Sequence, residues 1–178
     1  MLSRFWSLPL LIALCACTSD VQPSPIVLTP SGLGVVRLGM TVTEAQTALG
    51  AQLDPMPAGG DAACWMTRRA DGRAPQVFYT VQNGRITRID INTATYAGTP
   101  SNVTTASGIG VGASEADVLK AYGKSTQVLP SKYDAHGHVL AVESAAARST
   151  LVFETSDHKV TTFGAGLHPS VDHVEGCS

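Results

Sequence analysis

Two stretches decide the fold: GMTVTEAQTALG at residues 39–50 and GASEADVLKAYG at residues 112–123. Each opens with a hydroxyl residue and has an acid three positions later: Thr41 and Glu44, Ser114 and Asp117. In this capping-box spacing the hydroxyl accepts from an early helical N–H group, and the acid turns back to the capping residue. The apolar residues beyond the cap recur at three and four positions. Each stretch therefore predicts a short amphipathic helix of about two turns, ended by a glycine in a left-handed conformation.

The likeness continues downstream at nearly the same offset, which is 73 residues for the helices and 74 for the segments C-terminal to them. In the alignment of the two copies, VFYTVQNGRITRIDI at residues 77–91 corresponds to LVFETSDHKVTTFGA at residues 151–165. Asn83-Gly84 is a strong hairpin signal, because both residues tolerate positive φ between β-branched and aromatic runs. Asp157-His158 holds that place in the second copy and predicts a looser turn. Each copy is therefore expected to contain an antiparallel strand pair with one face buried.

A third strand is expected before each pair, at residues 63–69 and 138–144, and a short extended lead-in before each helix, at residues 36–38 and 109–111. The fold class is then α+β, with two tandem repeats that each consist of a short helix and a three- to four-stranded antiparallel meander. We expect the first repeat at residues 31–100 and the second, with a C-terminal tail, at residues 101–178. One unit cannot bury its apolar faces alone, so the two repeats should pack as one body.

The first helix block resembles the opening of two related groups. The letters GMT, EA and LG, at residues 39–41, 44–45 and 49–50, are similar to a motif of the small outer-membrane lipoprotein family BamE (SmpA/OmlA) and of the β-lactamase inhibitory proteins. Ala113 and Ser114 replace the methionine and threonine in the second block. The resemblance covers about a dozen residues and implies a helix-plus-sheet architecture, in two tandem copies as in the inhibitor. The two-copy lipoprotein form also resembles a group of uncharacterised bacterial envelope lipoproteins.

The first 17 residues have the features of a lipoprotein signal peptide. Arg4 precedes an apolar run at residues 8–14, which is too short to cross a bilayer as a helix. Leu14-Cys15-Ala16-Cys17 fits a lipobox, in which a small residue directly precedes the acylated cysteine. Cys17 is a better anchor than Cys15, which comes after a bulky leucine. We expect cleavage before Cys17 and acylation there, palmitate included. An ordinary signal peptide with coincidental cysteines is the alternative.

Residues 18–30, TSDVQPSPIVLTP, are rich in Pro, Ser and Thr and are expected to form a flexible tether. Thr18 and Ser19 stand directly after Cys17, where an aspartate would indicate retention in the inner membrane. We therefore expect a lipid anchor in the bacterial outer membrane with the folded part facing the periplasm. Display on the cell surface stays open.

Cysteine use predicts one disulfide bond. With Cys15 removed and Cys17 acylated, Cys64 and Cys177 are the pair that remains in an oxidising compartment. A catalytic thiol or a metal ligand at Cys64 is the alternative, but no CxxC motif supports it.

Other candidate chemistry finds little support in the spacing of residues. His136 and His138 share a face if they lie on a strand, but no third ligand stands at a fixed spacing, so we expect solvated histidines, no metal site and no cofactor. The glycine-rich segments at residues 32–34 and 108–112 lack the pattern of a phosphate loop and are interpreted as turns. No serine lies in a nucleophile elbow. An enzyme is therefore not expected.

Aromatic and basic residues of the first repeat suggest a partner surface. Trp65, next to Cys64, either packs over the disulfide in the core or anchors a protein partner. Arg68 and Arg88 belong to an arginine-rich region that either forms a basic strip or is simply solvated. We name Trp65, Arg68 and Arg88 as the candidate partner surface. The chain has 12 Lys+Arg against 14 Asp+Glu and a formal net charge of −2, which argues against a nucleic-acid partner.

The sequence therefore predicts a non-catalytic periplasmic lipoprotein that acts as a protein-binding or envelope-assembly module. Its partners are the membrane, through the lipid, and another envelope protein. An inhibitor of a secreted or periplasmic hydrolase, similar to the β-lactamase inhibitors, is the alternative. An unrecognised enzyme is the third.

Overall fold

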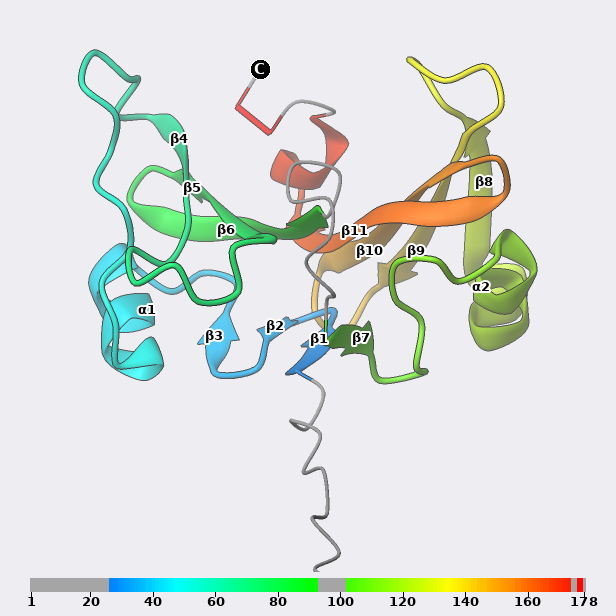
Figure 1. Cartoon of the computed structure of the whole chain (residues 1–178), viewed down its shortest axis with the longest axis horizontal. Helices are drawn as coiled ribbons and strands as arrows, with labels where there is room; N and C mark the ends of the chain where they lie inside the picture. The colour runs from blue at the N-terminus through cyan, green and yellow to red at the C-terminus, as the bar shows by residue number, and fades with distance from the viewer. Residues whose placement is uncertain (1–25, 93–101, 174–175, 178) are drawn as a thin grey trace, which may run out of the picture.

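The computed structural model describes residues 26–92, 102–173 and 176–177 (Figure 1). Its elements, in chain order, are β1 (Ile26–Thr29), β2 (Gly32–Leu33), β3 (Val36–Arg37), α1 (Val42–Leu49), β4 (Cys64–Thr67), β5 (Val77–Gln82), β6 (Arg85–Asn92), β7 (Val103–Thr105), α2 (Glu115–Tyr122), the 3-10 turn η2 (Gly123–Ser125), β8 (Thr126–Pro130), β9 (His138–Ser144), β10 (Ser149–Ser156), β11 (Lys159–Leu167) and the 3-10 turn η3 (Ser170–Asp172). None of the helices in these ranges combines the length and the apolar character that crossing a membrane requires.

The strands form two sheets, and the predicted α+β class is correct. The larger sheet is antiparallel, with seven strands in the order β4-β5-β6-β11-β10-β9-β8. The smaller sheet is mixed, with the order β3-β2-β1-β7 and a parallel pairing between β1 and β7. Figure 1 shows the large sheet curved like a saddle, with α1, α2 and the small sheet on its lower side and η3 on its upper side.

Both helices begin where the sequence predicts. The N-caps, Thr41 and Ser114, each accept a hydrogen bond of 3.2 Å from the backbone N–H group three residues on, and the acids there complete both capping boxes. The helix ends differ from each other. Gly50 adopts the left-handed conformation, with φ 59° and ψ 30°, whereas Gly123 has φ 61° and ψ −140° and leads into η2. The prediction of a left-handed end is correct for α1 and wrong for α2.

The two predicted hairpins are confirmed. The turn between β5 and β6 is Asn83-Gly84, with φ of 50° and 74°, and the turn between β10 and β11 is Asp157-His158, with φ of 46° and 61°. The second turn is therefore as tight as the first, not looser as its sequence suggests. The third strands are present as β4 and β9, and β9 has the predicted bounds of residues 138–144.

Four strands lie where the sequence predicts none: β1, β2, β7 and β8. β2 occupies Gly32-Leu33, in a glycine-rich segment that is interpreted as a turn. β1 occupies residues 26–29 of the expected tether, because Leu28 is fully buried and the strand pairs with β7, far along the chain. Residues 18–25 and Cys17 lie outside the described part. β8 forms the edge of the large sheet beside β9 and gives the second half four strands, whereas the first half has three. The expected lead-in at residues 109–111 is not a strand, although β3 matches the first one.

One hydrophobic core lies between the lower face of the large sheet and the helices with the small sheet. Its fully buried residues come from every layer: Leu28, Val36, Ala45, Ile89, Val118 and Phe153. Phe153 and Phe163, on neighbouring strands, stack with ring centroids 6.1 Å apart. Because the lower face supplies this core, alternate residues of the same strands are left on the upper face.

Residues 168–173 and 176–177, which we call the C-terminal segment, lie on that upper face and are held there by a disulfide bond and by hydrogen bonds. The predicted disulfide between Cys64 of β4 and Cys177 is present. The hydroxyls of Thr87 and Ser170 are 2.9 Å apart, and Arg88 Nη1 donates to the carbonyl of His173 at 2.6 Å. The segment can pack closely here because the sheet has a glycine at this position. A Cβ atom on Gly166 would lie 3.0 Å from the Val171 side chain.

Candidate functional site

The upper face of β8, β9 and β10 forms the floor of a cavity of about 510 Å³, which we call the upper groove. Its floor is a ladder of paired residues. Val152 pairs with Ala141, and Glu154 pairs with Val139. On the other side, Val139 pairs with Leu129 of β8. The groove therefore has an apolar floor beside a carboxylate, and Leu129 at its outer edge is 51% exposed.

Two segments wall the groove. The C-terminal segment contributes His168, whose Nε2 lies 3.0 Å from the Thr150 hydroxyl and whose Nδ1 lies 2.9 Å from a carboxylate oxygen of Asp172. The loop at residues 131–137, which joins β8 to β9, contributes Tyr133, with 62% of its surface exposed. Figure 1 shows this loop rising beyond the sheet at the end opposite β4.

Acidic groups face the groove. Burial raises the pKa of Glu154, Arg88 lowers it, and the nearby Asp90 raises it again. Glu143 lies two residues beyond Ala141 on the same face of β9 and also lines the groove, as does Asp172. A half-buried carboxylate with a raised pKa is stabilised in its ionised form by an added cation. The groove therefore favours a ligand that combines apolar and basic groups.

Strand β8 adds a second kind of contact. In the described part of the chain it pairs only with β9, so its other edge presents alternate backbone N–H and C=O groups outward. Val128 and Leu129 are 46% and 51% exposed on its two faces. An edge strand of this kind can pair with an extended segment of another protein.

A second cluster brings together residues that sequence spacing does not connect. Glu115 begins α2, His138 begins β9, and His158 lies in the turn between β10 and β11. His138 Nδ1 is 2.8 Å from Glu115 Oε1, and His158 Nδ1 is 3.1 Å from Glu115 Oε2. One ligand atom from each residue lies within 4.8 Å of the others, which makes this a candidate metal-ligating group. Glu115 cannot be recognised as a ligand from the sequence, because its only local signal is an acid in the first turn of a helix.

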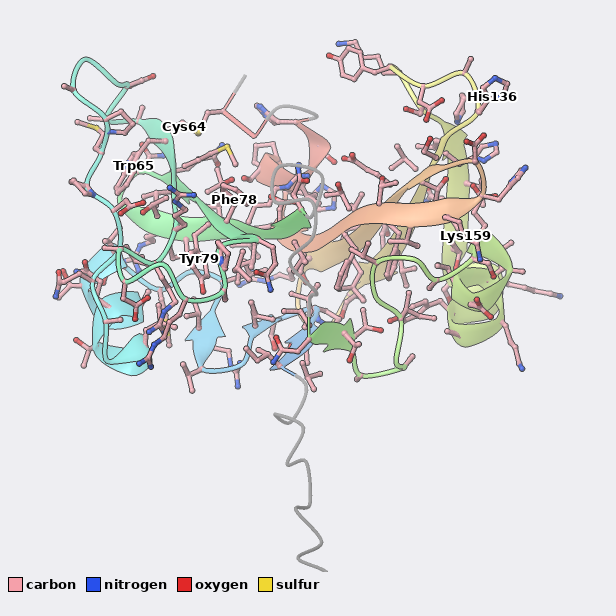
Figure 2. All side chains as sticks on the ribbon, viewed as in Figure 1. Cys64, Trp65, Phe78, Tyr79, His136 and Lys159 are labelled. Atoms are coloured by element: carbon pink, nitrogen blue, oxygen red, sulfur yellow. A yellow bond between two sulfur atoms is a disulfide. The ribbon has the colours of Figure 1, made fainter. Side chains whose placement is uncertain are left out.

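Hydrogen bonds set the charge of this carboxylate. Burial alone would raise the pKa of Glu115, but hydrogen bonds from Thr155, His158 and His138 outweigh burial and lower the pKa to about 2. Glu115 is therefore ionised at neutral pH, as a metal ligand must be. His136, the other histidine that the sequence singles out, lies in the loop at the outer end of the sheet and is not part of the cluster (Figure 2).

The three residues expected to form a partner surface lie in different environments. Trp65 is partly buried and packs against the core on the lower side, where it pairs with Val81. Arg68 is 41% exposed and pairs with Asp54 at 3.2 Å. Arg88 is buried on the upper face, where it forms an ion pair with Asp90. It also donates a hydrogen bond to the carbonyl of His173 in the C-terminal segment, so its charge is shielded from solvent. The structure does not gather these residues on one surface. Figure 2 shows Cys64 and Trp65 on the arm of the sheet opposite His136.

A further cavity, of about 570 Å³, opens between the small sheet and β5, with Leu33, Val35 and Tyr79 among its lining residues. Its wall includes Asn102, which borders the undescribed residues 93–101.

No protein-family model matches the chain, and no curated protein matches it. Among solved structures, the chain is similar to the crystal structure of a DUF4309 family protein, YjgB, from Bacillus subtilis subsp. subtilis str. 168. The two are 15% identical with a TM-score of 0.44, over 80% of this chain and 88% of that chain. This similarity carries no conclusion about function.

Proposed function

We propose that the protein is a non-catalytic binding module of the bacterial envelope. A lipid on Cys17 would hold it in the outer membrane, and its folded part would face the periplasm and bind another envelope protein. The upper groove is the observation that carries the binding part of this proposal. It joins an apolar floor, a half-buried carboxylate and an exposed edge strand in one place.

The chemistry of the groove defines the partner. An extended segment that pairs with the outer edge of β8 would place alternate side chains beside Gln127 and Leu129, and an apolar one fits beside Leu129. A Lys or Arg from a part of the partner that turns inward over the groove floor would meet Glu154 on β10, whose ionised form lacks full compensation. We therefore propose an extended partner segment that carries apolar residues and at least one basic residue.

Site-specific photocrosslinking tests this proposal. A photoreactive phenylalanine analogue at Leu129, in the full chain expressed in its native envelope, should give a discrete light-dependent adduct with one protein. Adding Glu154→Lys should remove most of the adduct, because the new cation repels the basic residue of the partner. Circular dichroism and the intact disulfide check that this variant folds.

The same analogue at Leu119 is the matched control, because Leu119 is 42% exposed but lies on α2, on the lower side of the sheet. No adduct is expected there. Equal adducts at both positions, or an adduct at Leu129 that Glu154→Lys leaves unchanged, would contradict the proposed site.

The second candidate is an inhibitor of a secreted or periplasmic hydrolase. The observation in its favour is the loop at residues 131–137, which projects past the sheet and exposes Tyr133 (Figure 1). Titrating the protein against β-lactamases and cell-wall hydrolases tests it. Unchanged activity at micromolar excess would count against inhibition of these enzymes.

We also propose that the two halves are copies of one ancestral unit, as the resemblance to the BamE and inhibitor groups implies. Matching capping boxes and matching two-residue hairpin turns support this. Strands β6 and β11, the last of each half, also pair at the centre of the sheet. An experimental structure in which residues 39–91 superpose on residues 112–165, helix on helix and hairpin on hairpin, is the expected result. Halves that cannot be superposed would refute the duplication.

A further inference from the structure

We propose that Glu115, His138 and His158 form a binding site for a single Zn²⁺ ion. This site lies at the junction of α2, β9 and the turn between β10 and β11, and it goes beyond the proposed partner groove. The three residues come from three separate elements, and each offers one ligand atom to the same small volume. Two imidazoles and one carboxylate are a ligand set found in zinc sites.

The spacing of the ligand atoms fits a zinc ion after small movements. In a tetrahedral site with bonds of about 2.0–2.1 Å, neighbouring ligand atoms lie about 3.3 Å apart. The distances from the carboxylate of Glu115 to His138 Nδ1 and His158 Nδ1 are 2.8 and 3.1 Å. These two distances therefore need to change by only a few tenths of an ångström, while the two imidazole nitrogens, which lie within 4.8 Å of each other, need to come closer together. Zinc would replace the protons that these nitrogens now share with the carboxylate.

The surrounding hydrogen bonds hold the ligands in place, and those of Thr155 and of the Glu115 backbone leave both imidazole Nδ1 atoms and Glu115 Oε2 unused. The backbone N–H of Glu115 donates to the carbonyl of His158 at 3.1 Å, which joins the start of α2 to the hairpin turn. The backbone N–H of His138 donates to the Thr155 hydroxyl at 2.9 Å. That hydroxyl in turn donates to Glu115 Oε1. Thr155 thus links two of the ligands, as an outer-shell partner does in known metal sites.

Burial and ligand type favour zinc over Ca²⁺ and Mg²⁺. The Glu115 side chain is only 15% exposed, whereas His158 is 77% exposed. The site is therefore shielded on the protein side and open on one side, which leaves the fourth position to water. Ca²⁺ and Mg²⁺ prefer sites made of oxygen ligands alone and would bind these imidazoles poorly.

Metal titration of the full mature chain tests the site. After treatment with a chelator, isothermal titration calorimetry with Zn²⁺ should show one ion bound per chain. Co²⁺ should give the visible absorption of a four- or five-coordinate ion, and Zn²⁺ should abolish it. His158→Ala and His138→Ala should each weaken zinc binding by more than the ~10–100-fold that the loss of an outer-shell partner costs. His158→Ala is the decisive variant, because this exposed turn residue does not support the core.

Two variants serve as controls. His136→Ala removes an exposed histidine two residues from His138, and His168→Ala removes the histidine paired with Asp172. Neither should change the affinity for zinc. The proposal is overturned if the wild-type chain shows no saturable zinc binding, if His158→Ala binds as tightly as the wild type, or if His168→Ala is the variant that loses binding.

Discussion

At the scale of single residues, Arg88 and Asp90 form a buried ion pair on the upper face of the sheet. They are 6% and 8% exposed, and Arg88 Nε lies 2.9 Å from both carboxylate oxygens of Asp90. Burial raises the pKa of Asp90, while the charge and the hydrogen bond of Arg88 lower it. The arginine also reaches the carbonyl of His173. One side chain therefore neutralises a buried acid and fixes the C-terminal segment to the sheet.

Removing this cation should be costly. Arg88→Met keeps much of the side-chain volume but leaves Asp90 buried without its partner, so we expect the free energy of unfolding to fall by about 3–5 kcal/mol. Urea denaturation followed by circular dichroism at neutral pH measures this loss. Arg73→Met is the matched control, because the Arg73 side chain is 82% exposed and its ion pair with Asp71 is long, at 3.9 Å. Equal losses in the two variants would show that the buried pair does not stabilise the fold.

Glu115 shows why the candidate metal site could not be predicted from the sequence. Its position three residues after Gly112 marks it as part of a helix start, and nothing nearby marks it as a ligand. The two histidines lie 23 and 43 residues further along the chain. The three residues come together only because α2 packs against the hairpin. Metal-binding sequence motifs, by contrast, reveal only ligands that are close together in the chain.

At the scale of elements, the helix starts are set by local chemistry. In both capping boxes the acid accepts from the backbone N–H of the N-cap, at 2.8 Å for α1 and 2.9 Å for α2. Each helix has only 8 residues, and one residue of each, Ala45 or Val118, is buried. Short helices gain little from propensity alone. The caps should therefore matter more here than in longer helices.

Loss of a cap should cost a measurable part of the stability. We expect Thr41→Ala to lower the free energy of unfolding by about 1 kcal/mol, because the N–H of Glu44 loses its acceptor. Thr43→Ala, the same substitution on an exposed position inside α1, should be neutral or slightly stabilising, since alanine is the better helix former. Thermal unfolding of both variants gives the comparison. A Thr43→Ala variant that is as unstable as Thr41→Ala would argue against the capping role.

Elements with local signals could be predicted, and those that depend on distant partners could not. The capping boxes and the Asn83-Gly84 turn are contained in a few consecutive residues, which is why the sequence predicts both helices and both hairpins. β1 lies in a Pro- and Ser-rich segment, and its burial depends on pairing with β7, which comes after the whole first half of the chain. β8 has exposed residues on both faces, so it lacks the alternation that marks a half-buried strand.

At the scale of the whole molecule, the C-terminal segment connects the β4 edge of the large sheet to β10 in the second half. The disulfide attaches it to β4 at one edge, while His168 and Asp172 reach the upper groove above β10. The wall of the proposed binding site therefore depends on a covalent bond at the far side of the molecule. The disulfide persists only in an oxidising compartment, so the position of this wall is fixed most firmly there.

Opening this bond should loosen the C-terminal segment and destabilise the whole fold. The disulfide closes a loop over a sequence separation of 113 residues. The chain-entropy model gives an upper limit of about 4.7 kcal/mol for a loop of roughly this length. We expect a Cys64→Ala, Cys177→Ala double variant to unfold at a lower urea concentration, with its free energy of unfolding reduced by up to that amount. Amide hydrogen exchange at residues 168–173 should also become faster in this variant. The segment should not detach completely, because Thr87 and Arg88 still hold it. Reductant should bring the wild type to the midpoint of the double variant and leave the double variant unchanged. A wild-type midpoint that does not respond to reductant would mean that the bond contributes nothing to the fold, and the upper groove would then need another explanation for its fixed wall.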